Sequence, residues 1–385
     1  MRLPTVLFAA SALLLSSACR DDKVNDLDDG TVTEEEDVFE NDFGQWLSMD
    51  ATPEGKPAIA YYDYTKGALG YAVADLDADG VPAWRHYPVD GYAGSDGLDP
   101  GDIGKYASMA IAPDGTIWIA YYNASVGGLY YAKCSDGTWE TGLADAGSGA
   151  SPDAGQWASL ALNDNNEPVI AHYDAGKSQL RVARWNGSGF TAEVVDEGED
   201  YTAVDTGDAD IPADVGRYAR IHIAGGTEYI AYYDAANGDL KLAQSSGGSW
   251  SIDVVDSEGD VGAWPSMAHD GSELWIAYHD VGQQDLKVAH GSSSFTFEVV
   301  DDGEHVGADS EIVVGNNGAP EILYFDGQEN DMKWTRSSGS SWETPSTVTG
   351  AEGARGFHNE TVMVGETRYV ACYDYTARTV WFSSL

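Results

Sequence analysis

Basic residues are scarce in this sequence. It contains 20 Lys and Arg against 64 Asp and Glu, which gives a formal net charge of -44. A surface this negative repels nucleic acid and anionic lipid head groups. We therefore expect no nucleic-acid partner and no direct binding to a membrane surface. The charge favours divalent cations or cationic partners, although a solvated acidic coat is the simpler explanation.

Cysteine and helical periodicity are scarce too. Of the three cysteines, Cys134 and Cys372 fall in repeats that are not neighbours in the ring inferred below. A disulfide tolerates a Cα separation of about 7 Å at most, so we expect two buried thiols and no disulfide framework. After residue 20 there is no long stretch of helical periodicity. The 45 glycines and 11% aromatic residues are typical of short strands joined by tight turns.

Common catalytic motifs are missing as well. The chain has no phosphate-binding GxxxxGK[ST] loop, no GxSxG elbow, no HExxH and no paired CxxC. No short motif therefore assigns an enzymatic activity.

The N-terminus carries an export signal. A basic Met-Arg start precedes an apolar run at residues 3–15, and small residues follow it up to Cys19. The run is too short for a lasting membrane span. The placement of Cys19 resembles a bacterial lipoprotein signal, which implies cleavage before Cys19 and lipidation of its side chain. Ser16 stands where that signal usually has Leu, so plain secretion is the alternative.

The chain divides into three parts on this basis. Residues 1–18 form the predicted signal peptide. Residues 19–30 are polar and acidic without periodicity, as expected of a flexible tether. Residues 31–385 form the predicted folded domain.

A five-residue motif organises that domain and recurs seven times with a period of roughly 50 residues. Its clearest form is Ile-Ala-Tyr-Tyr-Asp at residues 230–234. The seven copies begin at Ile59, Ile119, Ile170, Ile230, Ile276, Ile322 and Val370. Six residues after the end of each copy stands an apolar anchor: Leu69, Leu129, Leu180, Leu240, Leu286, Met332 or Val380. Such a period indicates a solenoid, a propeller or another array.

Each repeat reads as four antiparallel strands. A Gly with a large residue two places later opens a buried first strand, and the motif and its anchor form the second and third. Turns such as Asn237-Gly238 are strong hairpin signals. Four strands repeated around a ring predict an all-β, seven-bladed β-propeller. The seventh repeat ends before its fourth strand, so we expect the N-terminal segment 31–39 to pair beside residues 380–382 and close the ring.

The hairpins also carry a resemblance. Ser135-Asp-Gly-Thr-Trp139 resembles the end of an Asp-box, the hairpin motif of sialidase-like propellers. From Gly44 onward the chain resembles bacterial seven-bladed propellers with YYD repeats. That resemblance implies the fold alone, because such propellers include lectins, hydrolases, lyases and scaffolds.

The acids that end the motif are the first candidate site. They should share a face with the long acidic links at 90–102, 145–153 and 196–214, where binding usually occurs on a rigid scaffold. The alternative is that each acid only caps a turn. These acids are Asp63, Asp174, Asp234, Asp280, Asp326 and Asp374.

The second residue after each opening Gly is the second candidate. In blades one to five it is Trp46, Tyr106, Trp157, Tyr218 and Trp264. These rings could stack on sugars, or they could be packing between blades. In blades six and seven the position becomes Asp309 and His358.

The fourth residue after each opening Gly breaks its pattern in three blades. It is Ser48, Ser108, Ser159 and Ser266 in four blades, and Arg220, Glu311 and Glu360 in the others. Glu311 and Glu360 should be neighbours, and two close carboxylates raise at least one pKa, as in acid/base or cation sites. The alternative is that these acids are solvated or bonded to Arg355.

A calcium loop is the third candidate. Asp75, Asp77 and Asp79 alternate before Gly80, which resembles the start of EF-hand-like and integrin-type loops. Ala83 and His86 depart from those patterns, and an ordinary hairpin turn is the alternative.

Together these observations predict a monomeric, exported bacterial lipoprotein at the outer membrane or cell surface, or else a periplasmic or secreted protein. Its propeller face would bind a glycan or a protein, with Ca²⁺ as the candidate cofactor and the lipid as its only membrane contact. One alternative is a glycoside hydrolase or polysaccharide lyase that uses Glu311, Glu360, His358 and Arg220. The other is a structural surface protein with no small ligand.

Overall fold

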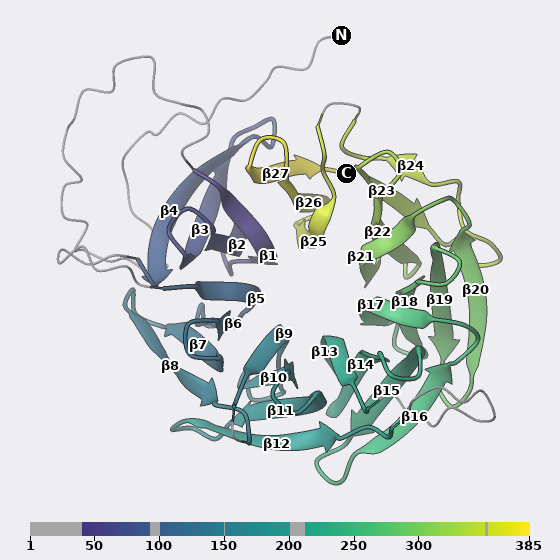
Figure 1. The fold of residues 1–385 in the computed structure, drawn as a ribbon. Coiled ribbons are helices and arrows are strands. Elements are labelled where there is room, and N and C mark those ends of the chain that lie inside the picture. Colours follow the sequence, from purple (N-terminus) through teal and green to yellow (C-terminus); the bar gives the residue numbers. More distant parts are fainter. Residues whose placement is uncertain (1–40, 93–100, 150, 201–211, 351–352) are drawn as a thin grey trace.

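The computed structural model describes residues 41–92, 101–149, 151–200, 212–350 and 353–385, and these form strands and no helix. Seven antiparallel sheets are arranged around a central axis, each with its first strand innermost (Figure 1). The predicted seven-bladed β-propeller is therefore confirmed. No helix within the described ranges is long and apolar enough to cross a membrane.

The first four blades each contain four strands in sequence order. Blade one comprises β1 (Phe43–Ala51), β2 (Pro57–Asp63), β3 (Ala68–Leu76) and β4 (Pro82–Asp90). Blade two comprises β5 (Ile103–Ile111), β6 (Ile117–Asn123), β7 (Gly128–Cys134) and β8 (Trp139–Asp145). Blade three comprises β9 (Ala154–Leu162), β10 (Pro168–Asp174), β11 (Gln179–Trp185) and β12 (Phe190–Asp196). Blade four comprises β13 (Val215–Ala224), β14 (Thr227–Asp234), β15 (Asp239–Ser245) and β16 (Ser251–Asp256).

The remaining blades follow the same order. Blade five comprises β17 (Val261–His269), β18 (Leu274–Asp280), β19 (Asp285–Gly291) and β20 (Phe295–Asp301). Blade six comprises β21 (Val306–Val314), β22 (Pro320–Asp326), β23 (Asp331–Arg336) and the two-residue β24 (Ser346–Thr347). Blade seven comprises β25 (Phe357–Val364), β26 (Thr367–Asp374) and β27 (Thr379–Ser384). The predicted closing strand at 31–39 lies outside the described residues.

The ring closes between blades seven and one through contacts of the described residues. The Phe43 N–H donates to the Arg378 carbonyl at 3.2 Å. The Tyr373 hydroxyl donates to Asp42 at 2.7 Å. These bonds join segments more than 300 residues apart in the sequence.

The interfaces between blades explain why the opening Gly and the apolar anchor recur together. A Cβ added to Gly155 would lie 2.7 Å from the Cα of Leu129 in the preceding blade. A Cβ on Gly44 would lie 2.5 Å from Val380, which is the equivalent contact between blades one and seven. Only glycine allows this approach, and its φ of 104–113° at Gly44 and Gly155 also favours glycine. The Gly-to-anchor contact therefore sets the spacing of the blades.

The repeat acids take part in a second contact between blades. The hydroxyl of Tyr232, the first tyrosine of its motif, donates to Asp196 at the end of the preceding blade at 2.6 Å. The Lys241 ammonium bridges Asp196 at 2.5 Å and the repeat acid Asp234 at 3.7 Å. We call this arrangement the inter-blade clamp. It recurs with Tyr278, Asp256 and Lys287, with Tyr324, Asp301 and Lys333, and with His172, Asp145 and Arg181.

The repeat acids also cap turns, as the alternative interpretation expected. Asp234 accepts the backbone N–H of Asn237 at 3.1 Å, and Asp374 accepts that of Ala377 at 2.8 Å. One carboxylate thus holds its own hairpin while it faces a cation of the clamp. The acids are structural contacts, and much of the long links at 90–102 and 196–214 lies outside the described residues.

The two cysteines of the propeller differ. Cys372 is a buried free thiol, as expected. Cys134 is buried as well, but it is disulfide-bonded, so the expectation of a second thiol is wrong. The ring geometry behind that expectation excludes only a bond between these two residues.

Candidate functional site: a central funnel

The residue two places after each opening Gly is placed by a β-bulge. In blade one the register of β1 against β2 shifts between Gln45 and Ser48, and Trp46 lies in that shift. A bulge bends its strand and redirects a side chain. All seven residues at this position have φ between 46° and 56°, which is uncommon for non-glycine residues and costs free energy for bulky ones. The recurrence of this strained backbone in every blade indicates a shared purpose, which is to turn the side chain toward the axis.

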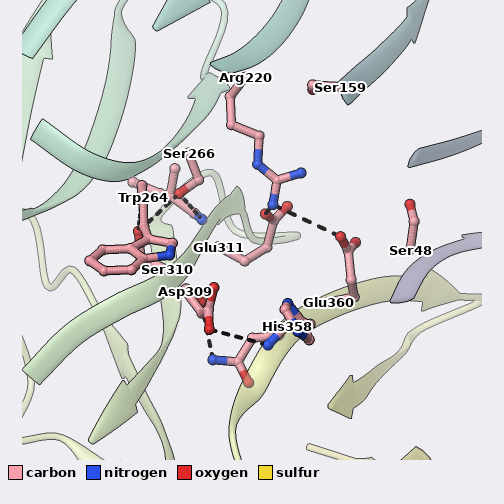
Figure 2. Close-up of polar contacts among 12 residues, drawn as sticks. Ser48, Ser159, Arg220, Trp264, Ser266, Asp309, Ser310, Glu311, His358 and Glu360 are labelled. Carbon is pink, nitrogen blue, oxygen red and sulfur yellow. Dashed lines mark hydrogen bonds and ion pairs between the residues drawn. The ribbon is translucent and has the colours of Figure 1, made fainter. Parts of the chain in front are cut away.

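Six of these seven side chains form a chain of aromatic rings around the axis. Neighbouring ring centroids lie 4.6 to 5.6 Å apart. The order around the axis is Trp264, Tyr218, Trp157, Tyr106, Trp46 and His358. Asp309 occupies the seventh position, between His358 and Trp264, where the carboxylate interrupts the aromatic ring (Figure 2).

In blades one to five the second aromatic residue of the repeated motif supports the ring from outside. Trp46 packs on Tyr62 at 5.5 Å, and Trp157 packs on Tyr173 at 5.4 Å between ring centroids. The hydroxyl of Tyr173 donates in turn to Asp214, in the link that enters the next blade, at 2.7 Å. The rings are half-buried, so they serve both as packing and as the wall of an open space.

The residue four places after each Gly forms a polar layer, and its serines join neighbouring blades. The Ser48 hydroxyl accepts the N–H of Met109 at 3.0 Å, and Ser159 accepts that of Ile221 at 3.1 Å. Glu360 takes the same role in blade seven, where it accepts the N–H of Met49. A carboxylate can therefore replace the serine without loss of this inter-blade bond.

Arg220 lies between the two glutamates of this layer (Figure 2). Its Nη2 is 3.4 Å from Glu311 Oε2 and 3.9 Å from Glu360 Oε1. The two glutamate oxygens are therefore no farther apart than the sum of these distances. The sequence left open whether these acids pair with Arg355. Arg355 instead bonds Asp374 at 2.6 Å, and Arg220 is the cation that pairs with the two glutamates.

Burial changes the protonation of this layer. Burial raises the pKa of Glu311, against the opposing charges of Arg220 and Arg368. Burial and the charge of Glu311 raise the pKa of Glu360 to about 8. The predicted raised carboxyl pKa is thus present, and the pair retains a proton at neutral pH. Burial also lowers the pKa of His358, which keeps its imidazole neutral at pH 7.

Acceptor atoms gather on the Asp309 side. Asp309 Oδ2 accepts the backbone N–H of His358 at 3.3 Å, and the backbone carbonyl of Asp309 accepts the side-chain amide of Asn359 at 3.1 Å. Asn359 is 2% exposed, and its Oδ1 has no hydrogen-bond partner. A buried unpaired acceptor is costly unless a ligand or water satisfies it.

The rings and the polar layer enclose one cavity of about 110 Å³. We call this cavity the central funnel. It is defined by the seven residues two places after each opening Gly, which we call the aromatic layer, together with Arg220, Asn359 and Glu360. Its volume is somewhat below the roughly 150 Å³ of a cavity that holds benzene. Eight of the predicted ligand-binding residues line it: Trp46, Tyr106, Trp157, Tyr218, Trp264, Asp309, His358 and Glu360. Glu311 contacts it through Arg220.

The predicted calcium residues lie elsewhere, at the hairpin between β3 and β4. Asp75 pairs with Lys56 at 2.6 Å and with Arg85 at 3.0 Å. Asp77 accepts the N–H groups of Asp79 and Val81, both at 2.9 Å. In the described ranges no group of three or more His, Cys, Asp or Glu is arranged to hold a metal. These contacts favour the hairpin turn, and calcium binding here stays a prediction. Cys19 lies outside the described residues.

Sequence reasoning missed Asn359 and the clamp cations. Asn359 follows His358 directly, but a lone Asn between two unusual residues carries no motif. The clamp had a visible signal, because an Asp ends the fourth strand at Asp90, Asp145, Asp196, Asp256 and Asp301. Its partners stand in the next repeat, and the repeat pattern alone does not pair them.

Comparisons with known proteins support the fold and no particular activity. No protein-family model matches the chain, and no curated protein matches it. Among solved structures, a Hadza microbial sialidase is 13% identical, with a TM-score of 0.50 over 85% of this chain and 73% of the other.

A structure from a study of two prolyl endopeptidases is 10% identical, with a TM-score of 0.54. The match covers 90% of this chain but half the length of that protein. The SapL1 lectin in complex with alpha methyl fucoside is 14% identical, with a TM-score of 0.49 over 81% of this chain and 98% of the lectin. At 10–13% identity, the likeness to the first two of these structures shows the fold alone.

Proposed function

We propose that this protein is a binding module that holds an end group of a larger ligand in the central funnel. The observation that carries the proposal is the continuous series of six aromatic rings around an open cavity, with Asp309 at the seventh position. Each ring stands on a bulged backbone, and in blades one to five an aromatic side chain of the motif supports it. A rigid wall of this kind loses little conformational entropy when a ligand binds.

A glycan or a protein displayed outside the cell is the proposed partner. The leader up to Cys19 supports an exported lipoprotein, anchored by its lipid to the bacterial outer membrane or the cell surface. The membrane fraction should lose the protein when Cys19→Ala is expressed, and unchanged fractionation would contradict lipid anchoring.

Glycan-array binding, followed by titration of tryptophan fluorescence, tests the binding function. Trp157→Asn removes one ring and keeps a residue type that tolerates left-handed backbone. We expect about tenfold weaker binding, in line with the free energy of an aromatic contact. Phe297→Asn is the matched control, because Phe297 is an exposed aromatic on the outer strand β20. Equal binding by both variants would contradict a site in the funnel.

Glycoside hydrolysis is the second candidate, and the Glu311–Glu360 pair favours it. Both carboxylates contact the same Arg220 nitrogen, so they are close enough to act as the two carboxyls of a glycosidase, and one of them keeps a proton. Arg220 stands between them, however, at 3.4 and 3.9 Å. Hydrolysis of a bound glycan by the wild type and its loss in Glu311→Gln would establish this activity. No hydrolysis, or full activity in the variant, would leave binding alone.

A further inference from the structure

We propose that the central funnel selects a positively charged group whose charge is spread over alkyl substituents, such as a quaternary or methylated ammonium. This inference rests on the proposed function, because it names the ligand class of the same site. Aromatic faces attract such cations through their quadrupoles, and tryptophan does so most strongly. Three of the six rings are tryptophans.

The seventh position of the ring supplies the counter-charge. Asp309 makes no salt bridge within the part of the chain that the structure describes, and its hydrogen bonds come from neutral groups. Among the described residues that line the funnel, Arg220 is the one cation, and it is already paired with Glu311 and Glu360. A carboxylate among aromatic faces with no cation of its own is suited to a cationic ligand.

An unpaired acceptor lies on this side as well. Asn359 directs its amide N–H toward the Asp309 carbonyl, which leaves Oδ1 unpaired and buried. A ligand with C–H or N–H groups beside a positive charge would satisfy this acceptor, whereas an anion would be repelled.

The aromatic layer already holds one cation of the protein itself. The Lys105 ammonium lies 5.8 Å from the centroid of the Trp46 ring and 5.6 Å from that of Tyr62. The funnel is also smaller than the benzene cavity noted above. A compact group such as trimethylammonium therefore suits it better than a whole oligosaccharide, whose remaining part would lie outside.

Calorimetry and tryptophan fluorescence with choline chloride test this inference, at constant ionic strength. The control ligand is 3,3-dimethylbutan-1-ol, which has the shape of choline without its charge. We expect choline to bind about tenfold more tightly than the alcohol. Asp309→Asn keeps the side-chain acceptor and tolerance of left-handed backbone, and it should remove most of that difference. Asp114→Asn, at an exposed hairpin turn, should leave both affinities unchanged.

The outcomes separate the ligand class from the site itself. Equal binding of choline and the alcohol, or an unchanged choline affinity in Asp309→Asn, would overturn the cation inference. If the protein binds a glycan in a way that depends on Trp157 but does not bind choline, the cation inference is overturned and the proposed function stands. Failure of choline, the alcohol and every arrayed glycan to bind would count against both.

Discussion

Gly262 lies against the backbone of Leu240, and a Cβ added to it would be 2.6 Å from the Leu240 Cα. Gly262→Ala should therefore destabilise the propeller by about 2–5 kcal/mol, from the clash and the positive φ together. Urea denaturation measures this change. Gly248→Ala is the control, because no atom lies within 4 Å of its added Cβ. A similar small effect in both variants would contradict the spacing role of the Gly-to-anchor contact.

The inter-blade clamp should stabilise the fold in a pH-dependent way. Asp196→Ala leaves the Tyr232 hydroxyl and the Lys241 ammonium without their shared acceptor, at a cost of about 3 kcal/mol. Burial tends to raise the pKa of Asp196, but hydrogen bonds from Lys241 and Tyr232 outweigh it and lower the pKa below 3.8. The clamp is thus fully present above pH 3.8 and is lost as the pH falls toward the folded-state pKa.

Thermal melts of wild type and Asp196→Ala between pH 2 and 7 check this prediction. The difference in melting temperature should be largest near neutral pH and shrink in acid. Asp253→Ala, an exposed acid on β16, is the control. A difference that does not change with pH would argue against the ionic part of the clamp.

Glu360 should make the protein less stable as the pH rises. Its folded-state pKa is about 8 against an ordinary value of 4.5, because of burial and the charge of Glu311. The folded state therefore binds the Glu360 proton more tightly than the unfolded state does. The stability that this gives is fully present below pH 4.5 and is lost as the pH rises to about 8.

Glu360→Gln should flatten that fall in stability, because Gln keeps an oxygen for the Met49 N–H and carries no charge. We expect it to be more stable than wild type at pH 8, by roughly 1–3 kcal/mol. Denaturant unfolding at pH 5 and pH 8 measures the effect. Glu366→Gln, in the exposed β25–β26 hairpin, is the control. If Glu360→Gln lost as much stability between pH 5 and pH 8 as the wild type, the prediction would be contradicted.

Calcium at the β3–β4 hairpin is tested by calorimetry with CaCl₂. A site at Asp75, Asp77 and Asp79 predicts heat of binding in wild type that Asp77→Ala loses. Identical traces would remove the site and leave Asp77 as a turn residue.

The N-terminal closing strand makes the last prediction. If residues 31–40 complete blade seven, their deletion should lower the melting temperature by about 5 °C or more, because β27 would keep β26 but lose its partner on the other edge. An unchanged melt would contradict the closure, and the Tyr373–Asp42 contact would then be sufficient to hold the ring.

The fold could be predicted because its signals are local and repeated. The motif at 230–234, its anchor Leu240 and the turn at Asn237-Gly238 each specify a strand or hairpin without any partner from afar. Counting from the opening Gly also brought Glu311 and Glu360 to neighbouring positions, which the structure confirms through their shared contact with Arg220.

The rest depended on contacts between blades. Asp196 and Lys241 stand 45 residues apart, and no pattern within one repeat pairs them. The left-handed backbone at Trp46 could not be predicted either, because aromatic residues disfavour it and only the bulge imposes it. The free acceptor of Asn359 follows from the orientation of a single amide, which sequence does not encode locally.

The bulge at the start of each inner strand has a consequence for how such molecules diversify. It turns seven side chains toward the axis, and the same left-handed backbone carries Trp, Tyr, Asp and His in different blades. The residues that line the funnel can therefore change from blade to blade, and with them the ligand preference, while the fold stays the same.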